Sequence, residues 1–493
     1  MKLPTNSLRF IIPALALLTT SARDASALSP IDRLYEYSLP YNYCSQMPLS
    51  NPALTAYSHH ERLSSLEAGW IGDMLIRKGF FDASTFMPLG NLSAAIWGDA
   101  AYSNGYRRPD GIIESADYDV TFPYALADTA GGRMKIENYS FGGGYSHRGS
   151  RLDWGASMNY IAALSYRSRD PRPRNVSGTL NLKAGAGYHV GGTYILAASA
   201  AYRKYKQSSS IMFMSELGEP VVYHLTGLGM AYNRFNSLGK NTHYSGDRYT
   251  LSIDLLPANR AGVIGSAEVS VMNIDYLLKD LNSLPLSHIR HETARFSAGY
   301  RSGTCRDCVS AAIYTDLWRR KGSENIFGDA SAGVYPVITA LDMFSADGRT
   351  IGVRAAGVKR LRKITLSFTA NAGYNHNSFE YLSPERRLGY NAWSLGLRPA
   401  LLYKAHRSLI SAGVSYWMQR NIDTDIIGFT SLSDAIISDC LHRFDRLSGS
   451  NDTVGLNIGY HREVTASVAL GLSFSATPTK AGNSLETKFI VSL

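Results

Sequence analysis

Apolar and polar residues alternate along much of this chain with a period of two. Between residues 152 and 166 the even positions are Leu, Trp, Ala, Met, Tyr, Ala, Leu and Tyr, whereas the odd positions are mostly small or polar. The same alternation returns in residues 249–255, 364–374, 454–460 and 466–474. A period of two predicts β-strands, because successive side chains of a strand point to opposite faces.

Three features favour a membrane β-barrel over a soluble β-sandwich. The alternating segments are about twice as long as the roughly 5–6 residues of a typical soluble strand. Tyrosines often stand at the ends of the apolar face, and the chain contains 31 Tyr against 17 Phe. The other face carries Gly, Ser, Thr and Asn, which suits a wet lumen. A transmembrane barrel has long strands, interfacial aromatic residues and a polar interior, so it accounts for all three.

The connections between the predicted strands alternate between short and long. Short ones fall at residues 147–150, 190–192, 257–261, 304–307, 360–363, 404–406 and 461–463, and long ones at 105–131, 167–175, 207–243, 277–288, 321–349, 378–387, 421–451 and 477–483. Outer-membrane barrels place short turns in the periplasm and long loops outside. We therefore predict an all-β fold, an up-and-down antiparallel barrel of about 16 strands with a range of 14–18, because strand boundaries are uncertain by several residues. A first hairpin, 66–72 with 80–88, would raise the count to 18.

The N-terminus has the pattern of a secretory signal peptide, predicted to span residues 1–27. The basic residues Lys2 and Arg9 come before a short apolar run at 10–18, and Ala25-Ser26-Ala27 has the pattern of a cleavage site. Residues 28–91 are predicted to form a periplasmic, plug-like segment or a plain leader, and residues 92–493 the barrel. The formal charge of +10 would permit a nucleic-acid partner. Export from the cytosol excludes one.

Two groups of charged residues are candidates for function. The first is a basic run at the tip of a predicted external hairpin, formed by Arg167, Arg169, Arg172 and Arg174. Lipopolysaccharide contact, lumen constriction and simple solvation are all open interpretations of it. The second is a set of charges on the predicted lumen face: Asp153, Lys183, Arg248, Asp254, Glu268, Arg295 and Arg398. Such charges select solutes in a pore, or pair across the lumen and rigidify it. A register slip of one residue would invert the whole assignment.

The cysteines and histidines give little sign of catalysis. Cys305 and Cys308 have redox or zinc spacing, but no second Cys pair completes a zinc site and no βαβ context is present. A local disulfide between them is the interpretation we favour. Adjacent residues such as His59, His60 and Glu61 seldom converge on one ion. No GxSxG motif occurs and no spacing among the 12 His singles out a triad. We predict neither an enzyme nor a cofactor.

Several stretches carry a family resemblance. They are Asn51-Pro52-Ala53, AAIWGDAAYSNG at 94–105, DPRPRN at 170–175 and YHLTGLGM at 223–230. In their order they resemble an uncharacterised family of outer-membrane β-barrel proteins of Bacteroidota type. The resemblance implies location and fold and no activity. The chain departs from many bacterial barrels by ending in Leu493 rather than in an aromatic residue, although Phe489 and Val491 share the face of Leu493.

These observations predict a porin-like channel that passes small solutes across the outer membrane of a Gram-negative cell. Two alternatives remain open: a non-conducting accessory barrel that partners another envelope protein in uptake or secretion, and a carrier of hydrophobic ligands. The expected surroundings are the outer membrane and its lipopolysaccharide. The loops at 207–243 and 321–349 are long enough to fold inward and narrow a pore.

Overall fold

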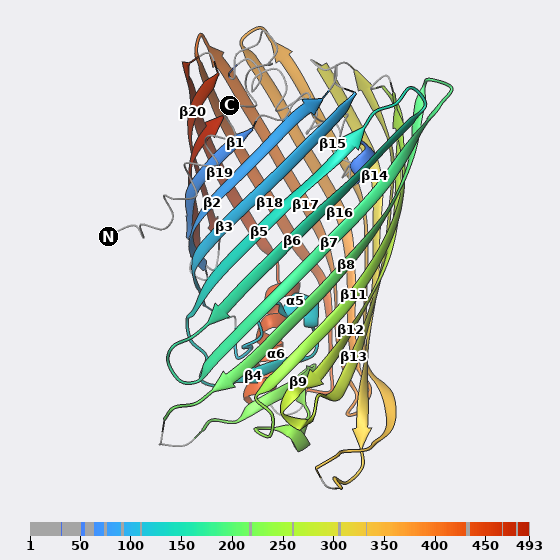
Figure 1. Ribbon diagram of the computed structural model, residues 1–493, viewed down its shortest axis with the longest axis vertical. Helices are drawn as coiled ribbons and strands as arrows, with labels where there is room; N and C mark the ends of the chain where they lie inside the picture. The colour runs from blue at the N-terminus through green and yellow to red at the C-terminus, as the bar shows by residue number, and fades with distance from the viewer. Residues whose placement is uncertain are drawn as a thin grey trace.

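The computed structural model describes residues 31, 51–54, 64–72, 76–89, 93–108, 111–215, 219–258, 261–303, 307–331, 333–429, 434–465, 467–479 and 482–492. Within this part of the chain, 18 antiparallel strands form one closed sheet, and they run steeply inclined to the long axis of the barrel (Figure 1). The last strand closes the barrel by pairing with the first, with Ser65 opposite Ser492. The predicted fold class is thereby confirmed.

The strands of the barrel follow one another in chain order around the wall. They are β1 (Ser65–Gly72), β2 (Ile76–Leu89), β3 (Ala94–Arg107), β5 (Met134–His147), β6 (Leu152–Tyr166), β7 (Arg172–Val190), β8 (Tyr194–Met212), β11 (Asn241–Pro257), β12 (Gly262–Leu278), β13 (Leu284–Gly303), β14 (Asp307–Phe327), β15 (Val337–Leu361), β16 (Ile364–Tyr381), β17 (Arg386–Ala405), β18 (Ser408–Ile427), β19 (Asn451–Thr465), β20 (Val468–Thr479) and β21 (Gly482–Ser492). The count lies at the upper end of the predicted range because the N-terminal hairpin, β1 with β2, belongs to the wall. The barrel thus begins at Ser65 rather than at residue 92.

The period of two in the sequence becomes two different faces of the wall. On β6, Leu152, Trp154 and Met158 are each about half exposed on the outside, whereas Asp153 is fully buried on the inside. The same pattern recurs around the barrel, for example with Leu251 and Ile253 exposed on β11. An outer surface covered by exposed aliphatic and aromatic side chains is what a lipid-facing barrel wall requires.

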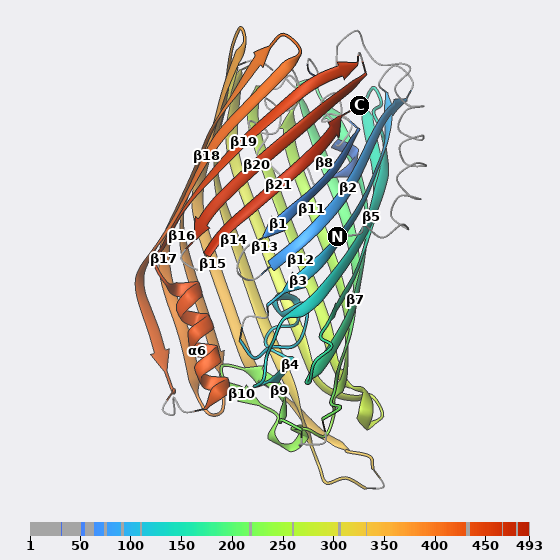
Figure 2. The same ribbon diagram turned by 90° about the vertical axis from the view of Figure 1, so that its left-hand side faces the viewer.

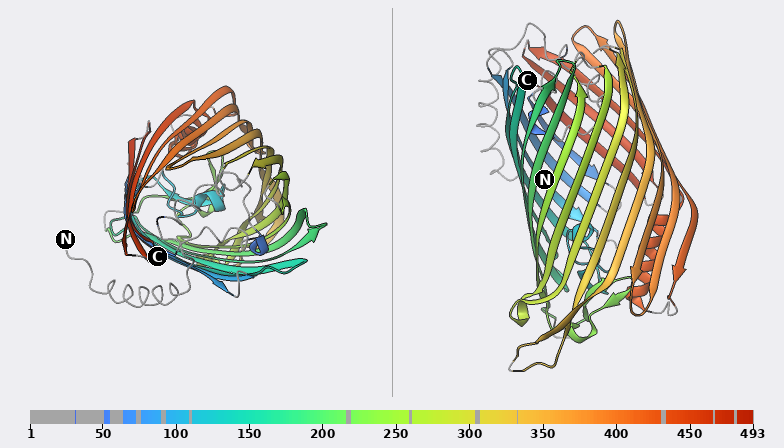
Figure 3. Two further views of the ribbon diagram at one scale, coloured as in Figure 1. Left: turned by 90° about the horizontal axis from the view of Figure 1, so that it is seen from above. Right: turned by 90° about the vertical axis from the view of Figure 1, so that its right-hand side faces the viewer.

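Three of the long connections, counted over the described residues, fold into the barrel at one end. The first, residues 111–131, contains α5 (Tyr118–Thr121) and β4 (Ala125–Asp128). The second, 219–240, contains β9 (Val222–Gly227), β10 (Met230–Ala231) and the short helix η3 (Asn233–Phe235), and the third, 434–449, contains α6 (Ala435–Ser448). Strands β4, β9 and β10 form a separate small sheet. We call these three segments together the loop plug; the view from above shows α5 inside the ring of strands (Figure 3).

The third segment of the loop plug is helical for local reasons. Asp434 caps the helix α6, since its side chain accepts a hydrogen bond of 2.8 Å from the backbone N–H of Ile436. Ile436, Ile437 and Phe444 lie on its buried side. Phe444 meets the ring of Tyr390 on the inner face of β17, with ring centres 6.0 Å apart. This contact holds α6 against the lower part of the wall (Figure 2).

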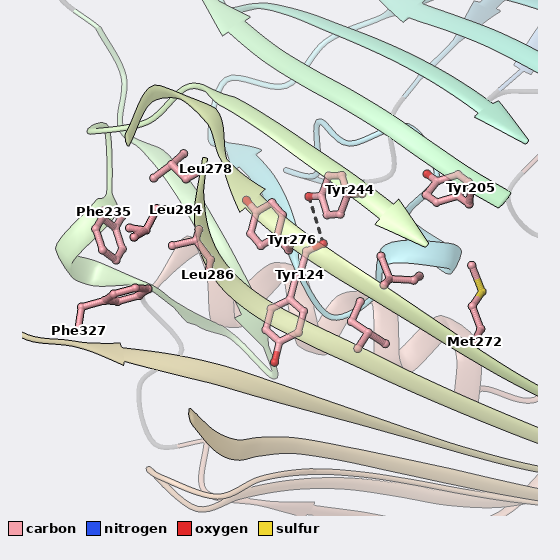
Figure 4. Close-up of a cluster of buried hydrophobic side chains, with 12 residues drawn as sticks. Tyr124, Tyr205, Phe235, Tyr244, Met272, Tyr276, Leu278, Leu284, Leu286 and Phe327 are labelled. Carbon is pink, nitrogen blue, oxygen red and sulfur yellow. Dashed lines mark hydrogen bonds between the residues drawn. The ribbon is translucent and has the colours of Figure 1, made fainter. Parts of the chain in front are cut away.

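Packed aromatic side chains hold the loop plug against the inner wall. The rings of Tyr244 and Tyr276 stack with centres 4.6 Å apart, and the hydroxyl of Tyr244 donates to the backbone oxygen of Tyr124 in the plug at 3.4 Å (Figure 4). A second cluster joins Phe344 on β15 to Phe122 in the plug, with rings edge to face at 5.2 Å. Burying each such side chain contributes about 1.5–3 kcal/mol. Inward positions are therefore apolar at this end, although the sequence predicts a polar inner face throughout.

The long connections do not all behave alike. Residues 207–243 fold inward in their central part, which was one of the two options the sequence allowed. Residues 321–349 instead belong largely to β14 and β15, which continue as a hairpin beyond the rim (Figure 1). Residues 421–427 likewise belong to β18, so the connection that contains α6 starts after Ile427. Among the described helices, none has the length and apolarity needed to cross a membrane.

The described residues of the N-terminal segment lie inside the barrel near the short turns. The side-chain amide of Asn51 donates to the backbone oxygen of Ala198 at 2.8 Å. Leu54 packs against Ile195 on β8. Ile31 packs against Leu402 on the inner face of β17. A plug-like role for residues 28–64 remains a prediction, because most of them lie outside the described part.

Candidate functional site

Near the middle of the barrel, inward side chains from β3, β6–β8 and β11–β13 line a polar pocket of about 430 Å³, which we call the lumen pocket. Its charged side chains are Asp99, Lys183, Arg203, Arg248, Glu268 and Arg295. Arg295 pairs with Glu268 at 3.2 Å, and Arg248 donates to the hydroxyl of Ser270 at 2.7 Å. Four cations against two carboxylates leave a formal charge of +2. The side chains that line the pocket are therefore more basic than acidic, and a further carboxylate, Asp316, lies 3.9 Å from Arg295.

All seven charges predicted for the lumen lie on the inner face. The structure brings Lys183, Arg248, Glu268 and Arg295 together in the lumen pocket, and Asp254 lies within electrostatic reach of Lys183 and Glu268. Asp153 is fully buried near a short turn, where it accepts from the N–H of Gly149 at 3.1 Å and from His189 at 3.0 Å, which fits a structural role. Arg398 is exposed on the inner face of β17 but does not line the pocket.

Two charged residues of the pocket, Asp99 and Arg203, were not among the lumen charges predicted from the sequence. Both occupy inward-facing positions of their strands. Asp99 is an odd number of residues from the outward Ile96 and so lies on the other face, and Arg203 is two residues before the buried Tyr205 and so lies on the same face. The alternation itself was thus the available signal. In β3 and β8 the alternation is hard to recognise, because alanines and tyrosines occur on both faces of these strands.

A line of basic residues leads from the lumen pocket to the loop plug. His291 lies within electrostatic reach of Arg248 and Arg295, and Arg320 on β14 approaches His291 with Nε 3.4 Å from Nδ1. Arg320 in turn donates through Nη1 to the backbone oxygens of Asp119 and Phe122, each at 3.1 Å. Arg320 is therefore the side chain at which wall and plug meet on the plug side of the lumen pocket.

Arg167, between β6 and β7, fastens the loop plug to another part of the rim. Its guanidinium lies 2.8 Å from Glu114 and 3.3 Å from Asp128, two carboxylates of the plug, and all three side chains are at most 6 % exposed. Nε also donates to the backbone oxygen of Pro171 at 2.7 Å. Burial and the neighbouring Asp128 carboxylate raise the pKa of Glu114 to about 8. One guanidinium serves two carboxylates, so a proton on Glu114 neutralises the cluster.

The basic run is therefore divided, whereas the sequence suggested one external loop. Arg167 turns inward because two buried plug carboxylates would otherwise lack a cation. Arg169 and Arg174 are exposed, and Arg172 is partly exposed and pairs with Asp170 at 2.6 Å. Arg169, Arg172 and Arg174 therefore make up the accessible part of the basic run.

The predicted cysteine pair lies partly beyond the description. Cys308 takes part in a disulfide bond, and Cys305, the partner predicted for it, is outside the described residues, as are His59, His60 and Glu61 and the predicted signal peptide. In the described part of the chain, no three His, Cys, Asp or Glu side chains gather in a way that would hold a metal ion.

Comparison with known families covers nearly the whole barrel. One family model matches residues 76–491. The chain belongs to the family of unknown function DUF6850. This match confirms membership of a family without an assigned activity, and the Bacteroidota origin stays a prediction. Among curated proteins no relative of this DUF6850 member is found.

Solved outer-membrane receptors are similar to this DUF6850 chain at low identity. The siderophore receptor PiuA from Acinetobacter baumannii has 7% identity and a TM-score of 0.42, with 88% of this chain and 82% of that chain covered. The ferric-catecholate import receptor Fiu from E. coli K12 has 8% identity and a TM-score of 0.41, with 87% and 82% covered. The ferric preacinetobactin receptor BauA from Acinetobacter baumannii has 6% identity and a TM-score of 0.39, with 87% and 80% covered.

Proposed function

We propose that this protein is an outer-membrane barrel that passes small solutes, with a preference for anions, through a lumen closed on its outer side by the loop plug. The observation that carries the proposal is a charged lumen pocket in a barrel whose one end is filled by a plug made of the chain's own loops. The exposed apolar outer face supports membrane insertion. Export by a cleaved signal peptide is part of the same proposal.

The orientation follows from the connections. The start of β1 and the end of β21 meet at the end that carries the short turns. In outer-membrane barrels that end faces the periplasm, and the long loops face outward. The loop plug then closes the external mouth, and Arg169 and Arg174 face the outer leaflet.

Passage requires the plug to move, because clusters of buried aromatic residues hold it against the wall. Two polar links, Arg167 to Glu114 and Asp128 and Arg320 to the backbone of residues 119–122, add to these contacts. A barrel of 18 strands leaves a wide lumen when nothing fills it. Release of the plug would therefore connect the outside to the lumen pocket.

A second candidate function is that of a non-conducting accessory barrel. It is favoured because the aromatic side chains between plug and wall are almost completely buried. Tyr124 and Phe235 in the plug and Tyr244 and Phe344 on the wall are at most 1 % exposed. A plug that never leaves would make the outer loops a docking surface for another envelope protein.

The experiment that separates the two is single-channel recording in planar bilayers. Wild type is compared with a variant in which residues 219–239 are replaced by a short Gly-Ser linker, which removes β9 and β10 and leaves β8 and β11 paired. A matched control carries the same linker in place of the exterior connection 382–385. We expect rare or small steps from wild type and from the control, and large steady steps from the plug variant. Sealed bilayers from a plug variant that still shows a compact, heat-modifiable band would reject solute passage.

A further inference from the structure

A second cavity, distinct from the lumen pocket, lies between the loop plug and the wall. Its volume is about 700 Å³, within the usual range of small-molecule sites. It has no lining residue in common with the lumen pocket. Most of its lining is apolar and comes from the plug and from inward positions on β16 and β17, including Tyr118, Val120, Phe122, Met230, Phe379 and Leu388.

Four arginines enter this mostly apolar cavity from three different elements. They are Arg107 at the end of β3, Arg320 on β14, and Arg443 and Arg446 on α6. Two carboxylates, Asp117 and Asp119, also line it. The formal charge of the lining is therefore +2, and it is +1 when Asp439, which pairs with Arg443 from outside the lining, is counted as well. This positive charge lies beside aromatic rings.

Two of these arginines, Arg107 and Arg443, each have a buried donor group without an acceptor among the described residues. Arg107 donates through Nη1 to the backbone oxygen of Ala116 at 3.1 Å. Arg443 pairs through Nη2 with Asp439 at 2.6 Å and lies 4.9 Å above the ring of Tyr118. Nε of Arg107 and Nη1 of Arg443 are buried and have no acceptor among the described residues. Buried donors of this kind carry a free-energy penalty that an acceptor would remove.

The position of Arg443 is fixed by the meeting of α6 with the first plug segment. Asp439, its partner on α6, also accepts from the backbone N–H of Ile112 at 3.1 Å. Gly111 has a φ of +80° and lies so close that a Cβ there would overlap the Asp439 carboxylate. The guanidinium is thus held in place from two elements, as a recognition group must be.

We propose that this cavity binds an organic anion that joins an apolar body to a carboxylate or phosphate group. The anionic group accepts hydrogen bonds from Arg107 and Arg443, and guanidinium groups suit both anions because they offer planar pairs of donors. The apolar body packs on Phe122, Met230 and their neighbours. The inference rests on the proposed function, in which the cavity is the outer binding site for a solute that next meets Arg320.

The first test is a binding measurement on the full chain, folded in detergent, by isothermal titration. The probe is phenyl phosphate. Three comparison molecules each lack one feature: benzyl alcohol lacks the charge, inorganic phosphate lacks the apolar body, and phenyltrimethylammonium reverses the charge. We expect phenyl phosphate to bind at least about 10-fold tighter than each of the three. A lost charge-assisted hydrogen bond supplies this difference for benzyl alcohol and phenyltrimethylammonium, and the lost burial of the phenyl ring supplies it for inorganic phosphate. Equal binding of any comparison molecule overturns the proposal.

A variant pair then places the site without disturbing the fold. Leu447 lines the cavity, is 56% exposed and takes no part in the pair of Arg443 with Asp439. Leu447→Glu should weaken phenyl phosphate about 10-fold or more by adding a carboxylate, whereas the matched Leu447→Gln should change affinity less than about 3-fold. Equal affinities in the two variants refute a site here.

Cys440 supplies an independent readout of location. It lines the cavity and is a free cysteine. Bound phenyl phosphate should slow its modification by methyl methanethiosulfonate several-fold, and a Cys440→Ser variant identifies the signal. Binding without protection would place the ligand elsewhere. Because these assays need no membrane, binding in a protein that does not conduct would sink the proposed transport alone, and conductance without binding would sink the proposed site alone.

Discussion

Removing the Arg167 guanidinium is the most direct way to weaken the docking of the loop plug. Arg167→Ala deletes an ion pair of 2.8 Å to Glu114, a second of 3.3 Å to Asp128 and a hydrogen bond to the backbone of Pro171. All three side chains of the ion cluster are almost completely buried. The change removes from a dry site the guanidinium that pairs with both acidic side chains of the plug.

The size of the effect follows from that burial. Removing one partner of a buried ion pair costs about 3–5 kcal/mol, because the other charge stays desolvated. At roughly 1.4 kcal/mol for each factor of ten, the equilibrium between docked and released plug shifts by a factor of about 10² to 4 × 10³. The barrel itself should persist, since its ladders of backbone hydrogen bonds do not involve this side chain.

Single-channel recording tests this expectation directly. We expect Arg167→Ala to raise the fraction of time spent in a conducting state by at least about 10-fold over wild type. Arg174→Gln is the matched control, because Arg174 lies on the same hairpin but is exposed. An Arg167→Ala protein that folds to a heat-modifiable barrel and conducts no more than the control would show that this cluster does not hold a gate.

Three further expectations follow from the same contacts. The pKa of Glu114 is about 8 when docked and near 4.5 when released, so the docked plug binds an extra proton between these two values. Docking should therefore be strongest below about pH 4.5 and weaken until the pH has passed 8. Conductance should rise over the same range, level off above pH 8, and lose this dependence in Glu114→Gln. Asp128 and Arg167 face Glu114 directly, with Arg107 in electrostatic reach, so a profile unchanged in Glu114→Gln would assign the proton elsewhere. In an Arg167→Ala background, Arg248→Glu should move the reversal potential in a KCl gradient toward the value for potassium, and no movement would rule out the lumen pocket as the selectivity site. Replacing residues 434–449 by a Gly-Ser linker should keep the compact band on a gel, because α6 contributes no strand, and loss of that band would show that the plug is needed for folding.

The sequence alone determined the wall of this protein. A barrel strand must present apolar atoms to one side and polar atoms to the other. Neighbouring residues such as Leu152 and Asp153 show this alternation directly in the sequence. For the same reason the seven predicted charges lie on the inner face, and the alternation of short and long connections marks the two ends. The N-terminal hairpin was recognisable but could not be counted, because β1 has only eight residues.

Only the tertiary structure decided what fills the barrel. Glu114, Asp128 and Arg167 are far apart in sequence or separated by strands, and no local period relates them. Phe122 and Phe444 look like ordinary loop and helix residues until the wall supplies Phe344 and Tyr390 as partners. Side-chain alternation is a property of a strand by itself, whereas the docking of a loop depends on the shape and charge of a surface that exists only after closure. The wall could therefore be predicted from the sequence. The loop plug, the ion cluster of Arg167 that holds it and the cavity between plug and wall could not.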